Sequence, residues 1–264
     1  MTTVLRLFDG YPHTSPDLRD EVLRAQTLLQ DAGEEVDPDG YFGEGTEAAV
    51  VRFQQKRGLL ADGIIGPITW AALDGKVWHG DMEFPTAREK NDGVLSAHAR
   101  EAAKYWDAIG NASMEYRVPQ CVIAGVGSRE SGWGMALRPP GPGGTGDFVP
   151  RKGGLPVDGQ GYGRGLMQID FSAHEFARTG QWRDPALNIE YGAKTLAGNI
   201  KFFQGRGNAP AHVLRLAIAA YNCGARNVTR ALGAGLDIDY YTAHRDYSAD
   251  VLSRSGWFYA QGWR

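Results

Sequence analysis

Glu130 is the residue of this sequence best placed to donate a proton. It ends the stretch 128–130, directly after the apolar run 121–126 and just before a segment rich in glycine. A carboxyl group at the end of a buried helix, facing a flexible loop, is partly removed from water. Removal from water disfavours the charged form and raises the pKa, so such a group can keep its proton at neutral pH and donate it to a leaving oxygen. The alternative is an ordinary solvated glutamate.

A second set of polar groups follows a loop dominated by glycine and proline. These two residue types make up more than half of positions 138–165, and a loop of this length in a compact domain is either functional or disordered. Glycines let the backbone approach a ligand closely. In an extended segment Gln168 and Asp170 lie on the same side. Further along, Tyr221 ends an apolar helix and offers a flat ring with a hydroxyl group.

The elements that position these groups have helical periodicity. Apolar residues recur every three or four positions in five ranges, 97–109, 119–130, 188–203, 212–221 and 247–261. No stretch of similar length alternates as a half-buried strand does. We therefore predict a mainly α-helical domain over residues 94–264. Residues 76–93 lose this periodicity and place Pro85 among charged residues, so we predict a linker there.

The first 75 residues contain an internal repeat. Residues 39–50 align with residues 62–73, and each copy consists of an Asp-Gly turn, an apolar residue, a glycine and a helix start. Residues 18–32 form an amphipathic pattern before them. We predict a small three-helix domain over residues 18–75, preceded by an N-terminal extension, residues 1–17.

Composition and charge limit the kinds of binding partner that we expect for this chain. The chain has 264 residues and a formal net charge of -3, which fits one or two domains and gives no indication of a nucleic-acid partner. The N-terminus lacks the apolar core and cleavage site of a signal peptide. No apolar stretch approaches the about 20 residues that span a bilayer. We therefore expect neither nucleic-acid binding nor membrane insertion.

Cysteine and histidine spacing does not indicate a metal site. Cys121 and Cys223 are the only cysteines, and we interpret them as reduced thiols, although spacing alone leaves a disulfide between them open. His174 and Glu175 begin the His-Glu-x-x-His pattern of zinc peptidases, but Arg178 stands where the second ligand is needed. We expect no metal and no cofactor.

Residues 18–74 resemble the peptidoglycan-binding domain common at the ends of cell-wall hydrolases. The matching motifs are, in order, Asp39-Gly-Tyr-Phe-Gly, Val51-Arg-Phe-Gln-Gln and Asp62-Gly-Ile-Ile-Gly-Pro-x-Thr-Trp70. The resemblance implies that bacterial peptidoglycan is the partner of this domain. The candidate wall-binding residues are Asp39, Tyr41, Asp62 and Trp70. The alternative is that the repeat only builds turns and packing.

Four blocks in the second half of the chain resemble goose-type lysozyme, within the lysozyme-like fold shared with soluble lytic transglycosylases. They are, in order, Ser128-Arg-Glu-Ser, Gly165-Leu-Met-Gln-Ile-Asp, Ala220-Tyr-Asn-x-Gly-Ala-x-Asn-Val and Asp246-Tyr-Ser-Ala-Asp-Val. The resemblance implies that Glu130 is the general acid and that Asp170 is one of two water-positioning aspartates. For the other aspartate, Asp158 has the better spacing and Asp147 is the second choice.

The resemblance also implies a substrate and a mechanism. Candidate substrate-binding residues are Tyr162, Gln168, His174, Tyr221 and Asn222. The implied enzyme is an N-acetylmuramidase that cleaves the bond between N-acetylmuramic acid (MurNAc) and N-acetylglucosamine (GlcNAc) with inversion. In inverting glycosidases the two carboxyl groups stand about 6.5–9.5 Å apart to leave room for water.

The order of the two domains resembles a modular phage endolysin, a bacteriolytic enzyme of host lysis. That resemblance implies a monomer made in the host cytoplasm, which reaches the wall in the periplasm with help from a partner such as a holin. Two alternatives stay open. A lytic transglycosylase uses the same glutamate but forms a 1,6-anhydro product, and a wall-binding structural protein would carry an inactive catalytic domain.

Overall fold

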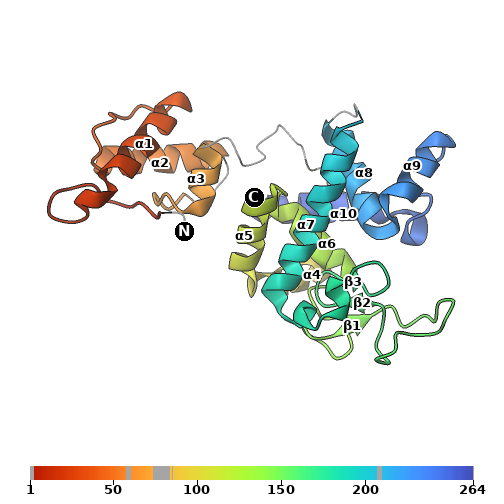
Figure 1. Cartoon of the computed structure of the whole chain (residues 1–264). Helices are drawn as coiled ribbons and strands as arrows, with labels where there is room; N and C mark the ends of the chain where they lie inside the picture. Colours follow the sequence, from red (N-terminus) through yellow and green to blue (C-terminus); the bar gives the residue numbers. More distant parts are fainter. Residues whose placement is uncertain (1–2, 58–60, 74–83, 85, 207–209, 264) are drawn as a thin grey trace. The chain divides into compact units, whose positions relative to one another are not determined.

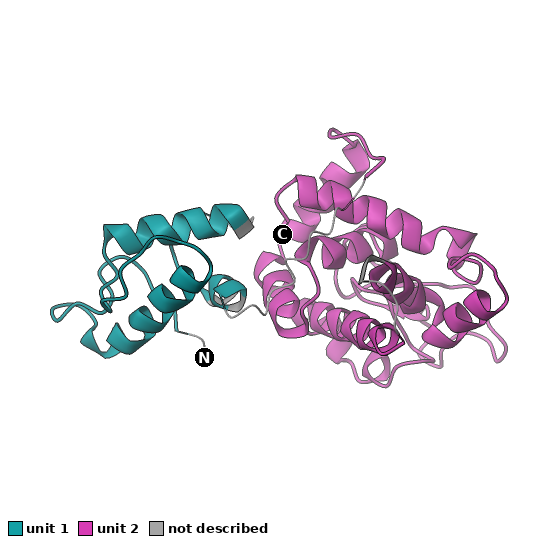
Figure 2. Cartoon of the chain, turned by 90° about the horizontal axis from the view of Figure 1, so that it is seen from above, with its two compact units in different colours: residues 1–81, 264 teal, residues 82–263 magenta. Residues whose placement is uncertain are grey.

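The computed structural model describes residues 3–57, 61–73, 84, 86–206 and 210–263. The chain divides into two compact units, one formed by residues 1–81 and one by residues 82–263 (Figure 2). Helices make up most of the described part of both units (Figure 1), which confirms the mainly α-helical prediction. None of the described helices is both long and apolar enough to cross a membrane.

The first unit contains three α-helices around one core. They are α1 (Arg19–Asp31), α2 (Glu44–Arg57) and α3 (Pro67–Leu73), preceded by the short 3-10 helix η1 (Pro16–Leu18). Pro67 occupies the first helical position of α3, where its missing N–H leaves no hydrogen bond unmade. Fully buried side chains from the helices and their connections form the core, among them Val22, Leu29, Phe42, Phe53 and Ile65.

The internal repeat builds one hydrogen-bonded unit twice. In the first copy the side-chain amide of Gln26 donates to the Asp39 carboxylate and to the Thr46 hydroxyl, both at 2.9 Å, and its oxygen accepts from the Gly40 N–H at 2.8 Å. The second copy repeats these three bonds with Gln54, Asp62, Thr69 and Gly63. Because a buried amide needs partners, each glutamine fixes the turn that precedes a helix.

Residues 3–17, predicted as an extension, pack into this unit. Leu5 is fully buried and pairs with Ile65 through two backbone hydrogen bonds of 3.0 and 2.9 Å. The Phe8 N–H donates to the Phe42 carbonyl at 2.8 Å. A bridge between such short segments has no periodic pattern, which explains why periodicity placed the start of the domain at residue 18. The predicted boundary between residues 75 and 76 lies outside the described residues.

The second unit consists of a central helix, other helices packed around it, and a small sheet. Its helices are α4 (Gly93–Ala103), α5 (Trp106–Tyr116), α6 (Gln120–Glu130), α7 (Pro185–Gln204), α8 (Pro210–Cys223), α9 (Ala225–Gly233) and α10 (Tyr247–Ala260). Short 3-10 helices, η2 (Phe176–Arg178), η3 (Gln181–Arg183) and η4 (Ala243–Arg245), lie in the connections. Within the predicted linker, the Glu89 carbonyl accepts from the Trp257 indole on α10 at 3.0 Å, so residues 86–92 also belong to this unit.

Helix α6 lies at the centre because its sequence allows burial on all sides. Every residue from Gln120 to Ser128 is buried, and α10 is the helix that packs most extensively against it. Two glycines permit this closeness. A Cβ on Gly125 would lie 2.4 Å from the Ser255 hydroxyl of α10, and a Cβ on Gly127 would lie 2.6 Å from the Trp133 ring.

The prediction of one helix over residues 97–109 was wrong, since α4 ends at Ala103 and α5 begins at Trp106. The Lys104 N–H bonds to the Glu101 carbonyl, three residues back, which tightens the last turn of α4. Tyr105 then leaves helical geometry, and its ring stacks on Trp133 at 6.0 Å between centroids. A tertiary contact therefore overrides the helical periodicity.

A three-stranded antiparallel sheet was not predicted. It consists of β1 (Thr145–Gly146), β2 (Gly163–Arg164) and β3 (Ile169–Asp170), with β2 between the other two. Gly163 pairs with Gly146 on one side and with Asp170 on the other. Strands of two residues are too short to show alternation. The sheet brings the end of the glycine-rich loop back to its beginning.

Packing of α6 against α10 gives a test of this arrangement. Replacing Gly125 by valine forces side-chain atoms into the Ser255 contact, so we expect Gly125→Val to lower the free energy of unfolding of the second unit by about 3 kcal/mol. Urea unfolding followed by tryptophan fluorescence measures the change.

Gly198→Ala is the matched control, because Gly198 is exposed on α7 and a Cβ there meets no atom within 4 Å. We expect this change to stabilise the unit by about 0.5–1 kcal/mol. Equal effects of the two substitutions would contradict the close approach of α6 and α10.

Candidate active site

Glu130 is the last residue of α6, and its side chain is half-buried. The Tyr247 hydroxyl, at the start of α10, donates a hydrogen bond to Glu130 Oε1. Burial raises the pKa of Glu130 to about 7, although the bond from Tyr247 and the positive charge of Arg129 act in the opposite direction. Near pH 7 a substantial fraction of Glu130 is therefore protonated. A carboxyl group in this state can act as a general acid.

Ion pairs fix the end of α6 against α10. Arg129 donates to Asp250 at 2.7 Å and to Asp246 at 2.8 Å. Arg254 donates to the same Asp250 carboxylate at 2.6 Å and to the Ser128 hydroxyl at 2.9 Å. The guanidinium adjacent to Glu130 is therefore held by α10, which leaves the Tyr247 hydroxyl as the hydrogen-bond partner of Glu130.

A pocket of about 380 Å³ opens onto the Glu130 carboxyl. Within the described part of the chain its lining comprises Arg129, Glu130, Asn222, Ala243, His244, Tyr247 and Arg254. The Asn222 amide oxygen accepts from the Ala243 N–H at 2.9 Å, which connects the end of α8 to η4. Residues from α6, α8, η4 and α10 thus surround the Glu130 side chain.

The sheet is attached to the residue that follows Glu130. The Ser131 hydroxyl donates to the Leu166 carbonyl at 2.6 Å. On the other side the Tyr221 hydroxyl, from α8, donates to the Met167 carbonyl at 2.7 Å. These two bonds hold the turn between β2 and β3 next to the end of α6, and Asp170 follows on β3.

Asp170 and Asp147 share one cation. The Arg151 guanidinium lies 2.6 Å from Asp170 Oδ2 and also pairs with Asp147, which directly follows β1. The other Asp170 oxygen accepts from the Ser172 and Ala173 N–H groups at 2.8 and 2.9 Å. Two carboxylates and one guanidinium thus form a cluster at the ends of β1 and β3.

Asp158 has a different environment. Both of its oxygens bind Arg164, at 2.9 and 3.0 Å, and the Arg164 side chain is fully buried. This pairing lowers the pKa of Asp158. Arg164 also stacks over the Phe171 ring, 4.6 Å from its centroid. Asp158 therefore compensates a buried charge and holds the loop to β2.

Two family descriptions match the sequence. Residues 19–73 match the "Putative peptidoglycan binding domain", and residues 95–262, more than half of the chain, match "Lysozyme g". The chain belongs to the lysozyme g family. Both resemblances noted in the sequence are thereby confirmed at the level of family.

Relatives of the lysozyme g family cover most of the second unit. Lysozyme G of Dromaius novaehollandiae is 30% identical over 172 residues, which is 64% of this chain and 73% of the relative. Lysozyme g of Cyprinus carpio is 31% identical over 164 residues, 61% of this chain and 75% of the relative. A crystal structure of Burkholderia AP3 phage endolysin covers 98% of the chain and 99% of that protein at 18% identity, with a TM-score of 0.25.

Gln168 does not occupy an extended segment in this lysozyme g family member. Its φ of 49° places it in the turn before β3, so the prediction that Gln168 and Asp170 share one side of a strand was wrong. Its side-chain amide donates to the Gly165 carbonyl at 2.9 Å and lies close to Gly146 and Gly163 of the sheet. A Cβ on Gly146 or on Gly163 would come within 2.2 Å of Gln168 Oε1, which explains the glycines at both positions.

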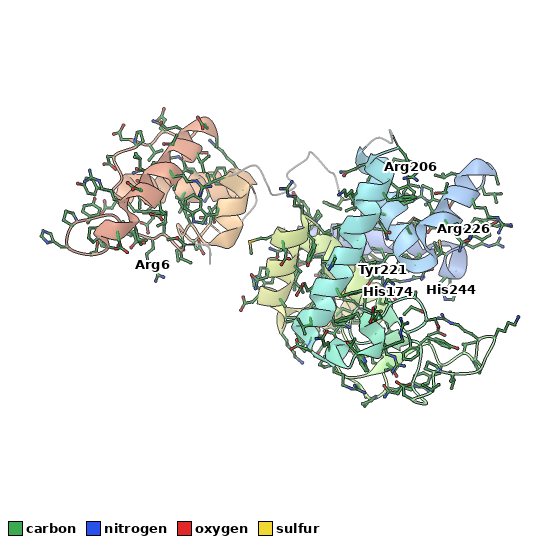
Figure 3. All side chains as sticks on the ribbon, in the orientation of Figure 1. Arg6, His174, Arg206, Tyr221, Arg226 and His244 are labelled. Carbon is green, nitrogen blue, oxygen red and sulfur yellow. The ribbon has the colours of Figure 1, made fainter. Side chains whose placement is uncertain are left out.

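The other candidate substrate residues divide between the pocket and the sheet. Tyr221 and Asn222 end α8 near Glu130, and burial raises the pKa of Tyr221. His174 follows Asp170 and contacts the Tyr191 hydroxyl of α7 at 3.2 Å (Figure 3 labels His174 and Tyr221 close to α7). Burial lowers the pKa of His174. Tyr162 is buried beneath Arg151, whose guanidinium lies 4.0 Å from the ring centroid.

The candidate wall-binding residues occupy different environments. Asp39 and Asp62 are exposed but accept the glutamine bonds of the repeat, so part of their role is to build turns. Trp70 is buried, and its indole N–H donates to the Thr3 carbonyl at 2.7 Å. Tyr41 is partly exposed at the surface. Of the four residues, Tyr41 alone combines exposure with an aromatic ring.

The sequence did not identify Tyr247 and Arg151, nor the pocket-lining residues Arg129, Ala243, His244 and Arg254. Tyr247 lies in the fourth block of the lysozyme resemblance, and that position was the available signal. Arg151 is one cation in a loop of glycine and proline, and no sequence pattern marks it. Cys121 and Cys223 are not joined in a disulfide. Among the described residues no group of three or more His, Cys, Asp or Glu side chains is arranged to hold a metal ion.

The Tyr247 hydroxyl gives a prediction for pH dependence. In Tyr247→Phe the carboxylate loses a hydrogen bond that stabilises its charge, while burial remains, so the pKa of Glu130 rises by about one unit. Because the protonated form donates the proton, wild-type activity falls as pH rises past about 7. We expect the variant to lose activity at higher pH, measured as kcat/KM on soluble peptidoglycan fragments.

Tyr116→Phe is the matched control, since the Tyr116 hydroxyl also bonds a carboxylate, Glu190, at 3.0 Å but outside the pocket. Its pH profile should equal that of the wild type. A Tyr247→Phe profile that stays in place or moves to lower pH would contradict the assignment.

Proposed function

We propose that the chain hydrolyses the MurNAc–GlcNAc bond of peptidoglycan with inversion, with Glu130 as the general acid. Membership of the lysozyme g family makes it a glycoside hydrolase of the lysozyme type. The observation that supports the role of Glu130 is its partly buried carboxyl group, whose pKa is raised to about 7 and which faces a pocket. Such a group gives its proton to the leaving oxygen as the glycosidic bond breaks.

We assign the activation of water to Asp170 together with Asp147. Both carboxylates bind Arg151, which offsets their mutual repulsion and keeps them at the same end of the sheet. Asp158, the position favoured by spacing, has both oxygens engaged by buried Arg164. Asp147 is therefore the second carboxylate of the proposal, and Asp158 is assigned a structural role.

In the proposed reaction Glu130 is the general acid, and Asp170 and Asp147 are the groups that act on water. Glu130 protonates the glycosidic oxygen while a water molecule, oriented by Asp170 and Asp147, attacks the anomeric carbon from the opposite face. The water proton passes to a carboxylate, and the sugar leaves with inverted configuration. Tyr221 and Asn222, beside Glu130, and Gln168 and His174, beside Asp170, would contact the sugars on the two sides of the cleaved bond.

The lytic transglycosylase remains the second candidate. It needs the same acid but attacks with the hydroxyl of the sugar itself, so it does not require a base for water. The carboxylate cluster around Arg151 favours hydrolysis, because that cluster supplies such a base. Mass spectrometry of released fragments separates the two reactions, since an anhydro end is lighter by one water. An inactive wall-binding protein is disfavoured by the partly buried, proton-holding Glu130.

The first unit supports a role in wall attachment, with peptidoglycan as its partner. We further propose that the chain is a monomeric, bacteriolytic endolysin of a phage. It would be made in the host cytoplasm and would act in the periplasm after release by a holin. The order of the two matched families supports this proposal, with the wall-binding match first and the lysozyme g match second.

Glu130→Gln tests the proposed role of Glu130 in two ways, through peptidoglycan lysis and through the pH dependence of stability. The amide keeps the bond from Tyr247 but has no proton to donate, so we expect lysis of purified peptidoglycan to be lost while wall binding remains. The folded-state pKa of about 7 lies above the ordinary value of 4.5. The contribution of Glu130 to stability is therefore fully present below about pH 4.5 and is lost as the pH rises through about 7.

Since one pKa unit corresponds to about 1.4 kcal/mol, Glu130→Gln should be more stable than the wild type by up to about 3 kcal/mol at pH 8, with no gain at pH 4. Chemical unfolding at both pH values measures this difference. Wild-type turnover in the variant would end the assignment of Glu130 as the acid.

Asparagine substitutions distinguish the two loop aspartates. Asp147→Asn and Asp170→Asn should each lower kcat by about 10²–10⁴, because the water loses its base. Asp158→Asn should keep most of kcat but destabilise the second unit by about 1–3 kcal/mol, because Arg164 keeps a weaker partner. Turnover of soluble fragments and urea unfolding measure the two effects. A large loss of kcat in Asp158→Asn, with Asp147→Asn active, would reverse the assignment.

A further inference from the structure

We propose that Phe8, Tyr11 and Tyr41, with Arg19 at one end, form a binding surface for the sugar chain of peptidoglycan. This aromatic row rests on the proposed wall-binding function and names its site. Ring centroids of Phe8 and Tyr11 are 6.2 Å apart, and those of Tyr11 and Tyr41 are 4.9 Å apart. The Arg19 guanidinium lies 4.3 Å from the Tyr41 centroid. The family match begins at residue 19, so Phe8 and Tyr11 lie outside it.

The backbone holds Phe8 in an exposed position. Its side chain is 55% exposed, and its φ of 75° lies in the left-handed region that a phenylalanine rarely adopts. Hydrogen bonds on both sides keep it there. The Phe8 N–H donates to the Phe42 carbonyl at 2.8 Å, and the Phe42 N–H donates to the Asp9 carbonyl at 2.9 Å.

Asp9 fixes the same turn through its side chain. One carboxylate oxygen accepts from the Arg6 N–H at 2.8 Å and the other from the Ser15 hydroxyl at 2.7 Å. The Phe8 carbonyl accepts from the Thr14 hydroxyl. Arg6, labelled on the first unit in Figure 3, begins this turn. An apolar ring held outward by this many polar bonds is a feature of binding sites, where unfavourable backbone geometry is retained for function.

The chemistry of the row fits a glycan better than a protein. Flat rings cover the C–H faces of sugars, and the tyrosine hydroxyls offer hydrogen bonds at the edge. Arg19 would pair with the carboxylates that the peptides of the wall carry, since guanidinium and carboxylate geometries match. A stable protein interface takes about 20–30 residues on each side. Three rings are too few for that, but rings inclined at 76° and 43° to their neighbours can contact one sugar strand with a face and with an edge.

Binding to purified cell-wall sacculi tests the row. All chains carry Glu130→Gln, so that the wall is not cut, and bound protein is measured by sedimentation over a range of sacculus concentrations. The test variant combines Phe8→Asn with Tyr11→Ala. Asparagine tolerates the left-handed region, so this change removes a ring without opposing the turn. We expect about tenfold weaker binding.

Control variants distinguish the loss of the aromatic rings from the loss of any exposed apolar side chain. Leu23→Ala removes an apolar side chain that is 40% exposed on α1, and Phe8→Tyr keeps the ring. Both should bind as well as the unsubstituted chain. Unchanged binding in the double variant would overturn the row. Self-association that the double variant abolishes, with wall binding unchanged, would also overturn it and assign the surface to a second copy.

A measurement on the unsubstituted rings covers the case in which the double variant fails to fold. Soluble GlcNAc–MurNAc fragments are added to the Glu130→Gln chain, and ring resonances are followed by NMR. Shifts of Phe8, Tyr11 and Tyr41 support the row, and shifts that leave these rings unaffected overturn it. Hydrolysis by the chain with native Glu130 is assayed separately, so failure of the proposed enzymatic function is read independently of the binding surface.

Discussion

The site depends on partly burying one carboxyl group at the end of α6. A buried carboxylate is unfavourable, and proteins avoid the penalty by keeping the group protonated, which is what a general acid requires. The burial in turn needs a helix without bulky or charged side chains over Gln120–Ser128, and glycines where α10 and Trp133 come close. The adjacent Arg129 is held by Asp250 of α10 and by Asp246 just before it, and its charge does not fully offset the effect of burial.

The opposite electrostatic environment lies at the sheet. Asp147 and Asp170 have Arg151 between them, and Asp170 also accepts hydrogen bonds from the Ser172 and Ala173 N–H groups. The surroundings of these carboxyl groups differ because different elements position them. Glu130 ends a core helix, whereas Asp147 and Asp170 lie at the ends of short strands next to an exposed loop. The Ser131–Leu166 bond joins the two regions at 2.6 Å.

The sequence predicted the parts of this arrangement that are local. Helical periodicity located α6, α7, α8 and α10, and the position of Glu130 after an apolar run indicated its burial. Strand pairing is non-local, so neither the sheet nor the turn that contains Gln168 could be read from the pattern. Because strand pairing is non-local, the sequence also could not decide between Asp158 and Asp147. Spacing along a long loop favoured Asp158, whereas the pairing of β1 with β2 brings Asp147 to the sheet and leaves Asp158 to compensate Arg164, a buried charge with no sequence signal.

The first unit shows how a repeat can serve structure and leave its surface for binding. Gln26 and Gln54 use the aspartates of the repeat to build turns, so those carboxylates are already engaged, and the rings left outside the core are what a wall polymer would meet. Binding by this unit holds the polymer without favouring its transition state, and so it cannot by itself accelerate cleavage. It raises the concentration of wall near a tethered active site. The proposed cleavage needs a protonated Glu130, and the proposed wall binding needs exposed rings. These two requirements can therefore be satisfied on separate units, each with its own core.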